Sequence, residues 1–192
     1  MTAQVELEAP LKRGDQDLAT LTFRRPDTAA ILDLSLVQLG QMNVDELRRL
    51  LPRISTDGLI EQEVDRIAAD DVLLIAREIS TFMEKPAAGD DDEEEPSDTR
   101  KMHAVARLAV PIARDGGDLT AINLRRPDTG SLRNLSLSDV GQLQVRALLT
   151  LLPRISPDNL TRKDLMKVDF ADWMELAGEV GDFLLPRRLR TA

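Results

Sequence analysis

The chain is one sequence segment written twice. A shift of 101 positions aligns RRPDT at residues 24–28 with RRPDT at 125–129, and LPRIS at 51–55 with LPRIS at 152–156. The correspondence runs from Pro10 and Pro111 to Phe82 and Phe183 without a gap. Internal repetition constrains the fold more than any local pattern, because both copies must build the same small module.

The segment between the two copies, KPAAGDDDEEEPSDTRK, lacks apolar periodicity. The acidic side chains at 90–95 repel one another, and no apolar surface is available to offset the entropy of ordering the backbone. We therefore predict a first module at residues 1–84, an acidic disordered linker at 85–101, a second module at 102–186 and a basic tail at 187–192.

Hydrophobic residues make up 42% of the 192-residue chain, but aromatic residues only 3%. A core of Leu, Ile, Val, Met and Ala favours helices that pack through aliphatic stripes. The chain has no cysteine, which excludes disulfides, thiolate metal sites and a cysteine nucleophile. Its start lacks the pattern of a signal peptide, and no apolar run reaches about 18 residues. We expect a soluble cytoplasmic protein without a membrane partner.

Each module begins with strand-like alternation and continues with helical periodicity. Residues 5–23 and 105–124 each contain two short apolar runs around a turn rich in Gly and Asp, which predicts a β-hairpin. Apolar residues at helical spacing begin at residues 36 and 137 and predict helices. Gly40 is expected to divide the first of these into a short and a longer helix. Pro52 and Pro153 are expected to end the helices. Asp57 and Asp158 are expected to begin a third helix, and residues 69–84 and 170–185 a fourth. The predicted fold class is α+β, mainly helical, with a hairpin and three to four short helices in each module.

A module of this size is small for an independent domain. It buries only about 60% of the surface that its unfolded chain exposes. We therefore expect the two modules to pack together as a pseudo-dimer, or each to pack against a partner. The oligomeric state of the chain stays open at this point.

The sequence contains few residues suited to catalysis or ligand binding. The net charge is −9, and outside the short tail no cluster of Lys and Arg predicts a nucleic-acid partner. His103 is the single histidine, and the common phosphate-loop, nucleophile-elbow and zinc-hydrolase motifs do not occur. Asp70, Asp71, Asp169 and Asp172 stand where helices are expected to begin, so capping explains them better than acid–base or Mg²⁺ chemistry. We predict no catalytic residues, no cofactor and no metal.

Arginines in the two repeated motifs and one tryptophan are the best candidates for binding a partner protein. In RRPDT, Pro suits the end of a strand and Asp or Thr a helix cap, yet paired Arg side chains can also hold a partner's carboxylates in forked hydrogen bonds. In LPRIS, every residue except Arg suits a corner between helices. The tryptophan stands where the first copy has Val72, either as a core residue or as an exposed anchor. The candidates are Arg24, Arg25, Arg125, Arg126, Arg53, Arg154 and Trp173.

The ordered motifs of the first copy resemble a known family. LSL at residues 34–36, QMNVDEL at 41–47, LLPRIS at 50–55 and a last helix that contains Phe82 are similar to the small tail assembly chaperones of Mu-like and related contractile-tailed bacteriophages. The resemblance covers residues 5–84 and 105–185. Two differences stand out: family members normally carry one module, and the second copy reads QLQVRAL, without the acidic residues of the first.

The resemblance implies a non-enzymatic protein of a phage or prophage. Such chaperones are expected to bind the tape measure protein and keep it soluble during tail tube assembly, with the major tail tube protein as a further candidate partner. They act in the cytoplasm of the host bacterium and are absent from mature virions. The alternative is a structural or adaptor component of the tail that uses a duplicated protein-binding module.

Overall fold

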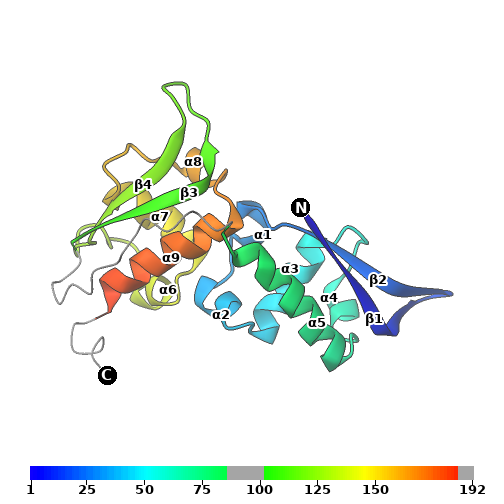
Figure 1. Cartoon of the computed structure of the whole chain (residues 1–192). Coiled ribbons are helices and arrows are strands. Elements are labelled where there is room, and N and C mark those ends of the chain that lie inside the picture. The colour runs from blue at the N-terminus through cyan, green and yellow to red at the C-terminus, as the bar shows by residue number, and fades with distance from the viewer. Residues whose placement is uncertain (86–101, 186–192) are drawn as a thin grey trace.

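The structure is a computed structural model that describes residues 1–85 and 102–185. The first module contains β1 Thr2–Arg13, β2 Gln16–Arg24, α1 Thr28–Ile31, α2 Leu36–Gly40, α3 Val44–Ile54, α4 Glu61–Val64, α5 Ala69–Ser80 and the 3₁₀ helix η1 Thr81–Met83. The second contains β3 His103–Ile112, β4 Leu119–Arg125, α6 Leu137–Gly141, α7 Val145–Ile155, α8 Arg162–Leu165 and α9 Phe170–Leu184. The predicted α+β class with two hairpin-and-helix modules is confirmed (Figure 1). The linker predicted at 85–101, apart from Lys85, and the basic tail lie outside the described residues.

Each hairpin is a two-stranded antiparallel sheet that lies against the last long helix of its own module (Figure 1). Alternate strand residues face the helices, so Val5 and Leu7 on β1 and Leu21 and Phe23 on β2 are buried. The apolar stripe of α3 closes the same core through residues such as Leu50. Burial of aliphatic surface between two layers stabilises each hairpin, which would be marginal alone. No helix within the described ranges is long and apolar enough to cross a membrane.

A buried aspartate on the last helix fixes an irregularity in each hairpin. The strand register shifts between Glu6 and Leu11 on β1, which leaves two amide groups without a partner in the ladder. Asp71 on α5 accepts hydrogen bonds from Glu8 N at 2.8 Å and Ala9 N at 3.2 Å. Asp172 on α9 makes the equivalent bonds to β3, at 2.8 Å and 3.4 Å. The prediction that these two aspartates cap their own helices is therefore wrong, because the strand amides occupy their carboxylates.

Two predicted helix boundaries are also wrong. Pro52 and Pro153 lie inside α3 and α7, which continue to Ile54 and Ile155. A proline so close to the C-terminal end removes a single backbone donor, and burial of the isoleucine holds the final turn in place. The third helix begins at Glu61 rather than at Asp57, and its equivalent begins at Arg162 rather than at Asp158. The two carboxylates instead accept hydrogen bonds from strand amides of the hairpins, Thr22 N at 2.6 Å and Asn123 N at 2.7 Å.

Candidate protein-binding surfaces

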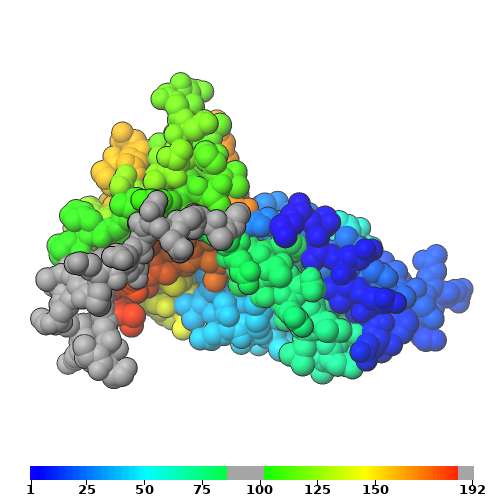
Figure 2. Space-filling model, viewed as in Figure 1, coloured from blue at the N-terminus to red at the C-terminus, as the bar shows by residue number. Residues whose placement is uncertain are grey.

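The two modules contact each other through two different surfaces. The first module contributes the knob, which we define as Arg25, Thr28, Ser35 and Leu36. The second module contributes the socket, which we define as Leu143, Val145, Asp169 and Trp173. In Figure 2 the light-blue surface around α2 abuts the yellow and orange surface of the second module, and α2 contacts α9.

Side chains of the knob and the socket form one half-buried and one buried polar contact. Arg25 holds Asp169 through two parallel hydrogen bonds, of 2.7 Å from Nε and 2.5 Å from Nη2. The indole Nε1 of Trp173 donates to Thr28 Oγ1 at 2.8 Å. The same hydroxyl lies 3.0 Å from Leu165 O and 3.2 Å from Val168 O, to which it donates. Each of these polar groups has a partner in the other module, so separation of the modules would leave them exposed to water or unpaired.

The backbones of the two modules are also joined. Val145 N donates to Leu34 O at 3.1 Å, and Leu36 N donates to Leu143 O at 3.3 Å. An isolated antiparallel bridge pairs Ser35 with Gln144. Lys85, where the first module ends, forms an ion pair with Asp172 at 3.0 Å and a second with Glu175. The modules therefore share side-chain, backbone and ionic contacts.

This junction is head-to-tail, not two-fold. In a two-fold pseudo-dimer, equivalent residues of the two modules would be buried alike. Here Leu36 is 1% exposed and its equivalent Leu137 is 74% exposed. Val145 is 0% exposed, whereas its equivalent Val44 is 65% exposed. The expected pseudo-dimer thus takes a heterologous form, with one knob and one socket used.

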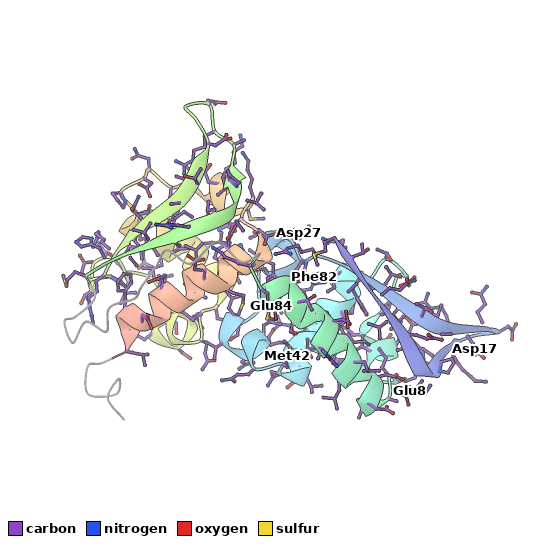
Figure 3. The ribbon with its side chains drawn as sticks, viewed as in Figure 1. Glu8, Asp17, Asp27, Met42, Phe82 and Glu84 are labelled. Atoms are coloured by element: carbon purple, nitrogen blue, oxygen red, sulfur yellow. The ribbon has the colours of Figure 1, made fainter. Side chains whose placement is uncertain are left out.

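The first arginine of each RRPDT motif lies on the surface of its module. Arg24 pairs with Asp27 at 3.0 Å, and Arg125 pairs with Asp128 at 3.3 Å. Each also donates to the backbone oxygen of the LPRIS arginine, Arg53 or Arg154, at 3.1 Å. Both side chains remain 42% exposed. Figure 3 places the label of Asp27 near the centre of the molecule, where the modules meet.

The LPRIS arginines hold their own modules together. Arg53 donates to Ala30 O at 2.9 Å and pairs with Asp33 at 2.6 Å. The hydrogen bond from Arg53 lowers the pKa of Asp33 to about 2. Arg154 donates to Ser131 O at 2.8 Å and to Arg133 O at 2.6 Å. Each arginine thus joins the C-terminal end of α3 or α7 to the segment that precedes α2 or α6.

The remaining candidates lie at or near the junction surfaces. Arg25 and Trp173 are engaged inside the junction, and the indole is 0% exposed, as expected for the packing interpretation of this residue. Arg126 is half-buried on the second module, at the position equivalent to Arg25. Thr28 and Asp169 are central to the junction, yet no sequence pattern singled them out as contacts between modules. Within the described ranges, no group of three acidic or histidine side chains could hold a metal ion.

Comparisons with known proteins match each module separately. The family described as phage tail assembly chaperone proteins, E, or 41 or 14, matches residues 4–84 and again residues 106–185. Tail assembly protein E of Escherichia phage P2 is 33% identical over 86 residues, which are 94% of that protein and 45% of this chain. Tail assembly protein E' of the same phage is 30% identical over 79 residues, which are 56% of that protein and 41% of this chain. No solved structure matches the chain significantly. Because the family pattern covers both modules almost completely, the chain belongs to the phage tail assembly chaperones, as a tandem duplication of the family's module.

Proposed function

We propose that the chain is a non-enzymatic chaperone that binds the tape measure protein of its phage and keeps that protein soluble while the tail tube assembles. The observation that carries the proposal is the match of both modules to the tail assembly chaperone family. A tandem arrangement suits a long partner, because a tethered second module meets that partner at an effective concentration of order millimolar. Action in the host cytoplasm, and absence from the finished virion, belong to the same proposal.

Exposed apolar side chains support binding of an aggregation-prone protein. Val105 and Val110 on β3 are 54% and 52% exposed, and Leu74 on α5 is 40% exposed. Apolar groups on a surface with polar neighbours can cover the apolar face of an amphipathic helix. Such contacts need no catalytic group.

Arg24 and Arg125 are the predicted contact residues best placed to reach a partner. Each stands at the same position of its module and pairs with an exposed aspartate. Exposed ion pairs of this kind contribute little stability, about 0–1 kcal/mol, so a partner's carboxylate can replace the aspartate at small cost. We propose that the two arginines bind acidic side chains of the tape measure protein.

Co-expression with the tape measure protein tests both parts. We expect the chain to raise the soluble fraction of that protein and to co-purify with it. The double variant R24A/R125A should weaken co-purification, whereas R66A/R162A, which removes two other exposed arginines, should not. Unchanged solubility without any complex would refute the chaperone function, and equal behaviour of the two double variants would refute only the arginine contacts. Detection of the chain in purified virions by mass spectrometry would favour a structural tail component instead.

A further inference from the structure

The head-to-tail junction uses one knob and one socket, so the equivalent surface on the other module lies outside the contact in each case. The open knob belongs to the second module and is defined by the exposed residues Thr129, Ser136 and Leu137, which follow Arg126, the equivalent of Arg25. The open socket belongs to the first module and consists of Met42, Val44, Ala68 and Val72; Figure 3 labels Met42. Thr129, Ser136, Leu137 and Val44 are all exposed. The molecule therefore presents one complementary surface on each module.

The open knob is identical in sequence to the knob that fills the junction. Arg25, Thr28, Ser35 and Leu36 correspond to Arg126, Thr129, Ser136 and Leu137, so all four residue types are repeated. In the filled junction Thr28 and Ser35 are 0% exposed and Leu36 is 1% exposed. Exposed Leu137 consequently has the chemistry, and the neighbours, of a residue that packs against a socket.

The open socket keeps the apolar part of the filled one and loses its polar part. Val44 is the same residue as Val145, and Met42 has about the size of Leu143. Ala68 and Val72 replace Asp169 and Trp173, so the acid that pairs with Arg25 and the indole that donates to Thr28 have no counterpart. A knob seated here would gain apolar burial and the backbone pairing, without the two polar contacts.

We propose that a second copy of this chain places the knob of its second module on the open socket of the first module, so that copies associate head-to-tail. The occupant follows from the junction already present inside the chain. There the knob of one module binds the socket of the next, and the open socket of one copy can bind the open knob of another copy in the same way. Repetition of a heterologous contact gives a ring or an open series of chains. This association does not involve the tape measure protein, and its test is independent of the proposed function.

The absence of native cysteine allows a direct test by cross-linking. Ser35 and Gln144 face each other in an antiparallel bridge, where side chains are close enough for a disulfide. The intramolecular pair S35C/Q144C should therefore close within one chain and serves as the positive control. The intermolecular equivalent is a mixture of two single variants, S136C and N43C. Cysteine is tolerable at position 43 because α7, the equivalent of α3, begins without a side-chain cap.

We expect the mixture of tagged S136C and untagged N43C to give a covalent heterodimer under oxidising conditions. A mixture of N43C with D118C, which places the cysteine in the exposed turn of the second hairpin, is the matched control and should give at least tenfold less. A heterodimer yield no greater than that control would overturn the proposal. So would a failure of S35C/Q144C to close, or a predominance of N43C homodimers, which would indicate a two-fold contact.

Sedimentation equilibrium of the cysteine-free chain provides the second measurement. The weight-average mass should rise with protein concentration, and L137D should suppress that rise without unfolding the chain, since Leu137 is 74% exposed. S138D, a charge of the same sign at an exposed site on the same helix, should preserve it. A68D/V72W, which restores the polar partners of the filled socket, should shift the rise to concentrations at least tenfold lower. Head-to-tail association would be refuted if the chain stayed monomeric at all concentrations, or if L137D left the rise in weight-average mass unchanged.

Discussion

Substitution of Thr28 by valine removes the central polar contact between the modules while nearly preserving side-chain shape. Thr28 Oγ1 accepts a hydrogen bond from Trp173 Nε1 at 2.8 Å and donates to the carbonyl groups of Leu165 and Val168. The side chain is 0% exposed, so water cannot replace the lost hydroxyl. Thr28→Val should therefore leave the indole N–H and a carbonyl oxygen unpaired in a buried site.

The expected cost follows from the two groups that lose their partner. A buried donor or acceptor left unsatisfied costs about 1–3 kcal/mol. The indole N–H loses its acceptor and Val168 O loses a donor, whereas Leu165 O keeps the backbone hydrogen bond from Val168 N. We expect Thr28→Val to lower the free energy of unfolding by about 2–4 kcal/mol. The duplication supplies a matched control, since Thr129 is the equivalent residue and is exposed. Thr129→Val should change stability by no more than about 0.5 kcal/mol.

Urea unfolding followed by tryptophan fluorescence measures this difference at the junction itself, because Trp173 is the only tryptophan of the chain. The wild type should emit at short wavelength, as expected for a buried indole, and Thr28→Val should shift the unfolding midpoint to lower urea concentration. Circular dichroism on the same samples separates loss of the junction from loss of the second module. Equal shifts for Thr28→Val and Thr129→Val would refute the assignment of the two threonines to a buried and an open knob.

Three further predictions concern the acidic residues. Because Arg53 lowers the pKa of Asp33 to about 2, the stabilisation by this carboxylate is complete above about pH 4 and is lost as the pH falls towards 2; the stability difference between wild type and Asp33→Asn should shrink over that interval in urea titrations. Asp71→Ala should lower the free energy of unfolding by about 2–4 kcal/mol, measured by circular dichroism, because two strand amides lose their acceptor. Asp169→Ala removes both the ion pair with Arg25 and the N-terminal cap of α9, and should cost about 2 kcal/mol with a red shift of tryptophan emission; an unchanged spectrum would contradict this role.

The fold class was predictable because each local pattern agrees with the structure that forms. Apolar residues at every second position predict the hairpins, and apolar residues at every third or fourth position predict α3 and α7. Both patterns arise because one face of each element is buried in the same core. The helix ends were less predictable: Pro52 is tolerated inside α3 because the buried Ile54 holds the last turn. Asp71 was misjudged for a related reason, because its partners lie on a strand 62 and 63 positions away.

The junction between the modules could not be read from the repeat. Val44 and Val145 are the same residue at equivalent positions of the repeat, yet they are 65% and 0% exposed. A repeat shows what two modules have in common, whereas a head-to-tail contact uses different surfaces of each. Burial of these residues depends on position in the chain and not on their identity.

Two differences between the copies nevertheless fall where the head-to-tail contact requires them. The knob residues are identical in both modules, but the socket carries Asp169 and Trp173 in one and Ala68 and Val72 in the other. A chain of two modules needs one socket that binds its knob strongly. If the open socket also carried an aspartate and a tryptophan, different copies of the chain would bind one another more tightly. Because the open socket lacks these polar groups, it binds a knob less tightly, and association between copies requires a high protein concentration. The junction inside each chain stays closed, because its two modules are tethered. The difference between the two sockets therefore makes the contact within a chain permanent and the contact between chains reversible.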